Sequence, residues 1–105
     1  MRTNKTKKSN SVQPRVSILI AAYNEELVIE SKIKSLLSTK FPIDRTEIII
    51  GTDNCTDKTD EIIKSYADKN TLIHHIKFDE RSGKIKIINS LVERASGELL
   101  ILTDA

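Results

Sequence analysis

The sequence has few of the residues that cross-link or bend small folds. Its 105 residues include one cysteine, two prolines, three glycines and no tryptophan. The single cysteine, Cys55, cannot form an internal disulfide and has no neighbour at metal-ligand spacing, which fits a reducing compartment. No run of apolar residues approaches the roughly 20 needed to cross a bilayer. These absences favour one small globular domain with a modest core.

The basic side chains are unevenly distributed. Residues 1–15 carry five of the seventeen lysines and arginines and no acid, whereas the rest of the chain has twelve basic and fifteen acidic residues. No apolar stretch follows the N-terminal charges, so this segment does not have the pattern of a secretory signal. We expect residues 1–14 to be a disordered basic leader, residues 15–105 to fold as one domain, and the protein to be cytoplasmic with no nucleic-acid partner.

Four short apolar segments have the composition of buried strands. They are rich in β-branched residues and bounded by polar ones, as in a sheet covered on both faces. The predicted strands are Val16–Ala22, Glu47–Asp53, Thr71–Phe78 and Glu98–Ala105.

The first two intervening segments have the spacing of amphipathic helices. Glu25–Thr39 places apolar residues three and four positions apart, and its two opening glutamates lie where the helix dipole favours acids. After the second strand, Thr56 and Asp57 offer capping oxygens to a second helix. The apolar positions of that helix are Ile62, Ile63, Tyr66 and Ala67.

A third helix is predicted between Gly83 and Gly97, with Gly97 as its C-cap. Its predicted apolar face comprises Ile88, Leu91, Val92 and Ala95. The resulting βαβαβαβ series predicts an α/β fold with a Rossmann-like parallel sheet and right-handed crossovers. The pattern leaves the order of the strands open.

Polar residues follow the predicted strands at their carboxyl ends, the edge at which open α/β sheets bind ligands. The first strand leads into Tyr23, Asn24 and Glu25. This turn lacks the pattern GxGxxG, which lets the backbone approach a pyrophosphate, and its glutamates would repel a phosphate. We therefore expect the first strand to bind an uncharged, donor-rich group such as a nucleoside.

Asp53 and Asp104, which end the second and fourth strands, each have two interpretations. Asp53 can accept hydrogen bonds from a base or a ribose, but its neighbours are also good turn formers. Asp104 emerges from a buried strand, where a carboxylate is costly unless it binds a cation or accepts hydrogen bonds, and this favours a functional role. Arg81–Lys84 places basic residues around a glycine at a helix start, a pattern that can bind an anionic group.

Four blocks, in this order and spacing, resemble the opening of the family-2 glycosyltransferases, which share the glycosyltransferase A-type fold. The blocks are Val16–Glu26, Glu47–Asp57, Arg81–Lys84 and Gly97–Ala105. Each block is modest alone, but the series covers the chain from about Val16 to its last residue. Two departures, at Ala21 and at Asn54–Cys55, replace the family's usual proline and Gly-Ser and are tolerable for the backbone.

The resemblance implies the transfer of a sugar from a nucleotide-diphosphate donor, commonly a UDP-sugar, to a hydroxyl of a glycan or lipid acceptor. It places Lys84 beside the base or the diphosphate. Asp104 matches the first acid of the Asp-x-Asp motif, whose carboxylates hold the nucleotide and a Mg²⁺ or Mn²⁺ ion. The nucleoside pocket is assigned to Ala22, Tyr23, Glu25 and Asp53.

The resemblance also predicts a glycosyltransferase A-type domain truncated at the Asp-x-Asp motif, with the second acid, the catalytic base and the acceptor half beyond Ala105. Membrane helices that follow such domains in polysaccharide synthases would place the complete enzyme at the cytoplasmic face of the membrane. A chain that ends after its fourth strand is expected to expose an apolar edge and to self-associate. The alternatives are a non-catalytic nucleotide- or partner-binding α/β domain and a structural piece that pairs with another chain.

Overall fold

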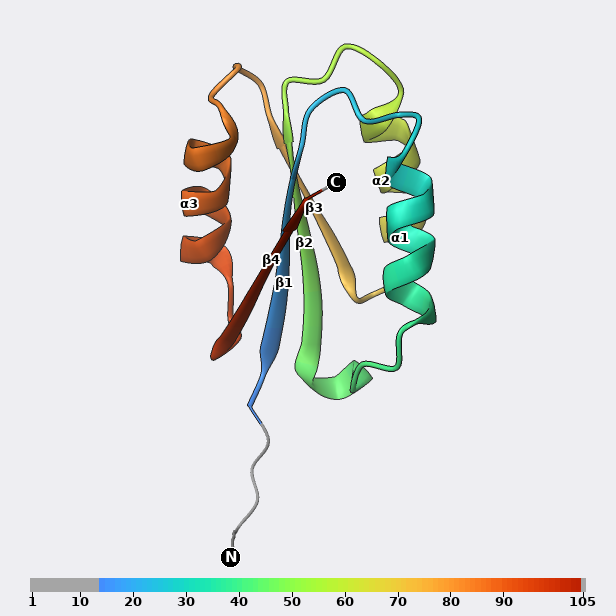
Figure 1. Cartoon of the computed structure of the whole chain (residues 1–105), viewed down its shortest axis with the longest axis vertical. Coiled ribbons are helices and arrows are strands. Elements are labelled where there is room, and N and C mark those ends of the chain that lie inside the picture. Colours follow the sequence, from blue (N-terminus) through green and yellow to red (C-terminus); the bar gives the residue numbers. More distant parts are fainter. Residues whose placement is uncertain (1–13, 105) are drawn as a thin grey trace, which may run out of the picture.

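The computed structural model describes residues 14–104 (Figure 1). The predicted leader, apart from Pro14, and the final Ala105 lie outside the described residues. In chain order the elements are β1 (Val16–Ala22), α1 (Ile29–Ser38), the 3₁₀ turn η1 (Ile43–Arg45), β2 (Thr46–Asp53), α2 (Thr59–Ala67), β3 (Ile73–Phe78), α3 (Lys84–Arg94) and β4 (Leu99–Asp104).

The strands form one parallel sheet in the order β3-β2-β1-β4. The chain moves outward from β1 through β2 to β3 and then returns to the other side of β1. Figure 1 shows α1 and α2 on one face of the sheet and α3 on the other. The predicted α/β class and parallel sheet are confirmed, and the order of the strands, which the sequence left open, reverses at β1. Such a reversal opens a crevice at the carboxyl ends of the strands.

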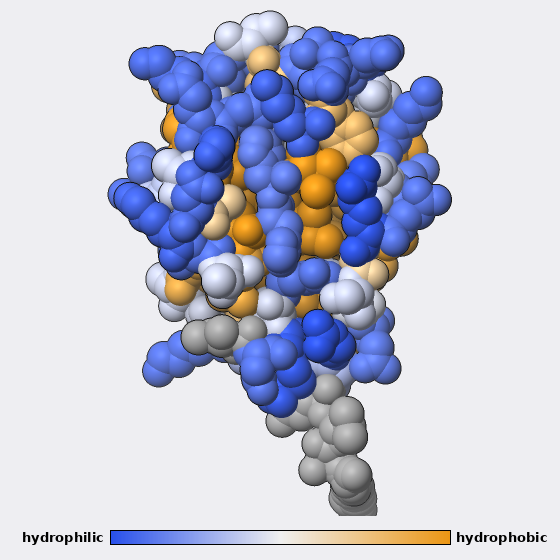
Figure 2. Space-filling view, turned by 180° about the vertical axis from the view of Figure 1, so that it is seen from behind, coloured by the Kyte–Doolittle hydropathy of each residue, from blue (hydrophilic) through white to orange (hydrophobic). Residues whose placement is uncertain are grey.

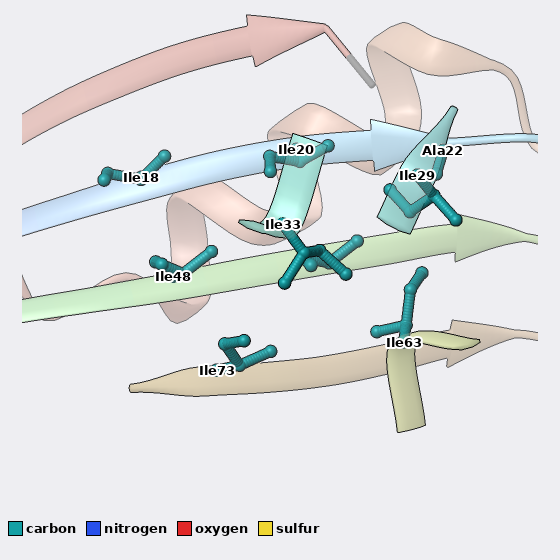
Figure 3. Packing of buried hydrophobic residues seen from close by; sticks show 9 residues of the cluster. Ile18, Ile20, Ala22, Ile29, Ile33, Ile48, Ile63 and Ile73 are labelled. Atoms are coloured by element: carbon teal, nitrogen blue, oxygen red, sulfur yellow. The ribbon is translucent and has the colours of Figure 1, made fainter. Parts of the chain in front are cut away.

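Side-chain alternation along the strands divides the core into two layers. On the α1–α2 side, isoleucines of the strands pack with Ile29, Ile33 and Ile63 of the two helices (Figure 3). On the α3 side, Leu19 and Ile49 pack against that helix. Full burial of one such side chain contributes about 1.5–3 kcal/mol, so each layer firmly attaches its helices to the sheet.

The apolar face of α3 differs from the prediction at two positions, because Ile87 rather than Ile88 is buried and Val92 is exposed. Ile87 and Leu91 are fully buried, whereas Val92 is 39% exposed. Ile87 packs over Gly51 of β2, where a Cβ atom would lie 2.7 Å from Ile87 Cγ2. Adjacent isoleucines at 87 and 88 allow two helical phases, and close contact with Gly51 selects the phase that buries Ile87.

Two helix boundaries also differ from prediction. Helix α1 begins at Ile29, so Glu25 and Glu26 lie in the turn before it rather than in its first turn. Helix α3 ends at Arg94, and its C-cap is the extended residue Ala95, so the predicted capping role of Gly97 is wrong. Gly97 instead allows close approach to β1, because a Cβ there would lie 2.5 Å from Ser17 Oγ.

Strand β4 pairs with β1 and forms one edge of the described sheet. Its apolar side chains are open to solvent, from 39% exposure at Leu100 to 56% at Leu102. The side of the molecule that faces away from the viewer in Figure 1 presents mostly hydrophilic residues, with hydrophobic ones visible between them (Figure 2). Among the helices of residues 14–104, none has the length and apolar character needed to span a membrane.

Candidate functional site

A cleft of about 320 Å³ opens beside the carboxyl end of β1, where the strand order reverses. All six residues predicted from the sequence as a nucleotide site reach it, although they come from four separate segments of the chain. What they bind stays a prediction. The cleft is lined by Ala21, Ala22, Tyr23, Glu25, Asp53, Arg81, Lys84, Ile87 and Asp104.

Asp53 anchors the inner end of the cleft. Its side chain is only 4% exposed and forms an ion pair with the guanidinium of Arg81. The backbone amides of Ser82 and Gly83 donate to its two oxygens, at 2.6 and 2.9 Å. Asp53 therefore serves the turn before α3, whereas the sequence-based alternative to ligand binding is a role in its own turn, and it also keeps a carboxylate at the wall of the cleft.

The turn before α3 depends on Gly83. This residue has φ 90° and ψ 154°, a conformation that residues with a Cβ rarely adopt. The geometry directs consecutive amides toward Asp53 while the chain turns into α3. The Arg81–Lys84 block thus has a definite local structure, with Arg81 and Lys84 both reaching the cleft.

Arg81 also covers the ring of Tyr23. Its guanidinium carbon lies 3.7 Å from the centroid of the ring, a close cation–π contact. Tyr23 is 40% exposed as a residue, while the guanidinium of Arg81 covers one face of its ring. Asp53, Arg81 and Tyr23 therefore form one stacked and charged cluster, to which the sequence prediction assigned only Tyr23 and Asp53.

The opposite end of the cleft carries a second ion pair, between Lys84 and Asp104. The hydrogen bond from Lys84 and the positive charge of Lys84 hold the pKa of Asp104 below the ordinary aspartate value. Next to it, Lys32 donates to the hydroxyl of Thr103 at 2.6 Å. The end of β4 is thus surrounded by positive charge, and the Asp104 side chain, 79% exposed, remains accessible to a ligand.

The described residues offer limited ligation for a metal ion. Over residues 14–104, no three His, Cys, Asp or Glu side chains gather as a ligand set. Asp104 nevertheless has one property of a ligand for Mg²⁺ or Mn²⁺, which is an exposed carboxylate that binds a cationic group. In this structure that group is the ammonium of Lys84. Mg²⁺ in phosphate-binding sites is often held by one or two carboxylates together with the phosphates and water, so a single carboxylate fits part of such a site.

The remaining predicted residues contribute differently. Ala22 is 2% exposed and belongs to the core cluster that includes Ile29, so it offers little surface to the cleft. Glu25 lies half-buried at the rim, where its amide donates to Thr59 Oγ1 at 2.8 Å. The sequence prediction missed Ala21, Arg81 and Ile87 as cleft residues. Arg81 had a usable signal in its basic, glycine-containing block.

The chain matches a known family and known structures. The model of "Glycosyl transferase family 2" matches residues 17–105. The probable glycosyltransferase YdaM of Bacillus subtilis is 34% identical over 95 residues, which cover 88% of this chain. The mannosyltransferase PcManGT of Pyrobaculum calidifontis, in complex with GDP-Man and Mn²⁺, superposes with a TM-score of 0.83 at 28% identity over 90% of this chain. TarS 1-349 of S. aureus, in complex with UDP-GlcNAc, has a TM-score of 0.79 at 27% identity over 86%.

The chain spans about a quarter of the length of these proteins: 23% of YdaM, 28% of the mannosyltransferase and 26% of the TarS chain. The two structural neighbours have the glycosyltransferase A-type fold, and this chain matches the N-terminal part of it. The fold expected from the sequence resemblance is therefore confirmed.

Proposed function

The chain belongs to glycosyl transferase family 2, and we propose that its cleft binds the nucleoside diphosphate part of a sugar donor. The observation that carries this proposal is the Asp53–Arg81–Tyr23 cluster. A planar, donor-bearing group, the guanidinium of Arg81, already stacks on Tyr23 and donates to Asp53. A nucleobase is also planar and carries N–H donors, so the same two residues offer it both kinds of contact.

The base therefore binds at the Tyr23 end of the cleft in this proposal. It stacks on the aromatic ring and donates to the carboxylate of Asp53. Arg81 moves aside from this position and remains available as a donor at the rim. Glu25, at the mouth of the cleft, accepts hydrogen bonds from the ribose, which suits hydroxyl groups better than phosphates.

The diphosphate lies toward Lys84 and Asp104. Lys84 contributes positive charge to the phosphates, and Asp104 supplies one carboxylate oxygen to a Mg²⁺ or Mn²⁺ ion. When bound, such an ion supplies charge stabilisation to the diphosphate leaving group. The neighbouring structure with GDP-Man and Mn²⁺ supports this assignment by analogy.

The proposed reaction of the whole protein is transfer of a sugar, from a UDP-sugar, to a hydroxyl of a glycan or lipid acceptor at the cytoplasmic face of the membrane. Two structural neighbours were solved with a nucleotide sugar, one with GDP-Man and one with UDP-GlcNAc, which supports the class of donor. We assign no catalytic base within residues 14–104. The alternative, a non-catalytic nucleotide-binding domain, shares the binding step and differs only in predicting no transfer.

Calorimetric titration of UDP into the purified chain, with Mn²⁺ present, tests the proposal. We expect binding that weakens about tenfold or more in Asp53→Asn and in Asp104→Asn, because each change removes a charged acceptor. Omission of Mn²⁺ should reduce the affinity of the wild type and leave Asp104→Asn almost unchanged. The same titration with GDP tests the choice of base.

Asp44→Asn is the matched control, since Asp44 is an exposed acid in η1, at the amino end of β2 and away from the cleft. It should bind UDP as the wild type does. Absence of UDP and GDP binding by a folded wild-type chain would refute the proposal. Equal losses in Asp44→Asn would show that the affinity follows net charge rather than the cleft.

A further inference from the structure

The loops that follow β1 and β2 are joined by side chains at the carboxyl edge of the sheet. The amide of Thr56 donates to Asn24 Oδ1 at 2.8 Å, and Asn24 Nδ2 donates back to Thr56 Oγ1 at 3.2 Å. Asn24 and Asn54 both have left-handed backbone angles, with φ 49° and 56°. The two loops therefore turn together, and the residues of one are positioned by those of the other.

A chain of hydrogen bonds then links the backbone at Glu25 to a carboxylate of the second loop. The amide of Glu25 donates to Thr59 Oγ1 at 2.8 Å, and the Thr59 hydroxyl donates to Asp57 Oδ1 at 2.6 Å. The other oxygen of Asp57 accepts from the amide of Glu26 at 3.2 Å. The amides of Glu25 and Glu26, in the turn before α1, are thus held by Asp57, the first through the Thr59 hydroxyl and the second directly.

A further hydrogen bond runs from the second loop to the first, because the amide of Lys58 donates to the carboxylate of Glu26 at 2.9 Å. Thr59 is fully buried, so its hydroxyl has these partners and little access to water. Partial burial of Asp57 raises the pKa of its carboxyl, but hydrogen bonds from Thr59 outweigh this effect and hold that pKa below the ordinary value. Asp57 is therefore an ionised, well-satisfied acceptor at neutral pH.

These contacts go beyond the capping of a helix. Asp57 precedes Lys58, the N-cap of α2, and its local bond is the one that it accepts from the amide of Thr59 on Oδ1, at 2.9 Å. The bonds to the amides of Glu25 and Glu26 span more than thirty positions in sequence. They fix the segment between β1 and α1, which lies outside the sheet ladder and carries Tyr23 and Glu25 into the cleft.

We propose that Thr59 and Asp57 are positioning residues for the donor site. Neither residue lines the cleft, but they hold the backbone of Glu25 and Glu26, and through it the orientation of Tyr23 and Glu25. The inference rests on the proposed function, because it adds a support to the same site. A loop fixed before binding loses less conformational freedom when the ligand arrives, so these residues raise affinity through pre-organisation.

The test compares Thr59→Val with Thr59→Ser. Valine matches the shape of threonine but removes the hydroxyl that both accepts from Glu25 and donates to Asp57, whereas serine keeps it. We expect the affinity for UDP with Mn²⁺ to fall about tenfold in Thr59→Val and to stay within about twofold in Thr59→Ser. Protection of the Glu25 amide from hydrogen exchange, measured without ligand, should fall in the valine variant only.

Asp57→Asn gives an independent variant if Thr59→Val does not fold. Its amide retains one acceptor oxygen, so one of the two links to the turn is lost, and a similar loss of affinity is expected. Ser17→Ala serves as the stability control, because Ser17 is a buried hydroxyl at the amino end of the sheet. It should lower the melting temperature without changing the affinity for UDP.

The outcomes separate the two proposals. Wild-type affinity in a folded Thr59→Val or Asp57→Asn overturns the positioning role and leaves the donor site intact. Loss of affinity in Ser17→Ala, in proportion to its lost stability, also overturns it, since any destabilisation would then suffice. Failure of the wild type to bind a nucleotide overturns the proposed function and, with it, this inference.

Discussion

Ser17 of β1 and Glu47 of β2 are register partners, and the Ser17 hydroxyl donates to Glu47 Oε2 at 2.6 Å. The same oxygen accepts from the amide and the hydroxyl of Ser96, at 2.7 and 2.9 Å. Ser17 Oγ in turn accepts from the amide of Gly97 at 2.8 Å. These bonds attach the segment between α3 and β4 to the two central strands, at the amino ends of β1 and β4.

Acid should weaken this connection. Burial raises the pKa of Glu47, but the bonds from Ser17 and Ser96 outweigh it and lower that pKa in the folded protein. The stabilisation from Glu47 is thus complete above the unfolded pKa of about 4.3 and is lost as pH falls through the lower folded value. Urea unfolding at several pH values should show that Glu47→Gln is less stable than wild type by about 1 kcal/mol at pH 7, and that this difference shrinks as the pH falls through the folded pKa of Glu47. A constant difference across this range would contradict the role of the charge.

Gly97→Ala should destabilise the protein through a steric clash. An added Cβ would lie 2.5 Å from Ser17 Oγ and 2.6 Å from Ser17 N, so backbone rather than a flexible side-chain end would have to move. We expect a loss of about 1–3 kcal/mol, typical of overpacking, measured by chemical denaturation. Ala95→Gly, in the same connection, is the comparison, and it lacks the added atom. A Gly97→Ala protein as stable as wild type would show that the two segments separate easily.

The sequence predicted β1 and β2 well because burial on both faces leaves a strong local signature, whereas β4 has the same signature although its side chains are open to solvent. Strands such as Val16–Ala22 are nearly continuous apolar runs, and each helix has one apolar stripe. The phase of α3 was less predictable, since Ile87 and Ile88 are chemically identical. Contact with Gly51, distant in sequence, decides between them.

The start of α1 and the contacts of Asp53 depend on residues far apart in the chain. Glu25 and Glu26 resemble a first helical turn, but α1 begins at Ile29, and the amides of the two glutamates bind Thr59 and Asp57. Arg81 reaches Asp53 across 28 positions. Local pattern placed the polar residues at the correct edge of the sheet, and the ion pairs that connect them arise only from the folded arrangement.

Substitution of Tyr23 should separate stacking from hydrogen bonding in the cleft. Tyr23→Phe keeps the aromatic face that Arg81 covers, whereas Tyr23→Ala removes it. Stacking of a base on an aromatic ring contributes about 1–3 kcal/mol, so the alanine variant should bind UDP about five- to 150-fold more weakly and the phenylalanine variant nearly as wild type. Titration calorimetry measures both. Equal affinity in the alanine variant would place the base elsewhere.

Strand β4 combines features that favour self-association. Within residues 14–104 its outer edge has no strand partner, and four consecutive apolar residues, Leu99 to Leu102, are each at least 39% exposed. Alternation along a strand places Leu100 and Leu102 on one face and the other two on the opposite face. An edge of this kind is a template for pairing with another chain.

We predict that the chain self-associates through β4 and that a lysine at position 102 prevents it. Sedimentation velocity over a range of concentrations should show a mass that rises for the wild type and remains monomeric for Leu102→Lys, because a charged edge residue opposes strand pairing. Leu27→Lys is the matched control, since Leu27 is 92% exposed but lies in the loop before α1. It should associate as the wild type does. A monomeric wild type at high concentration would refute the prediction, and loss of association in Leu27→Lys would move the contact from the strand edge to the loop.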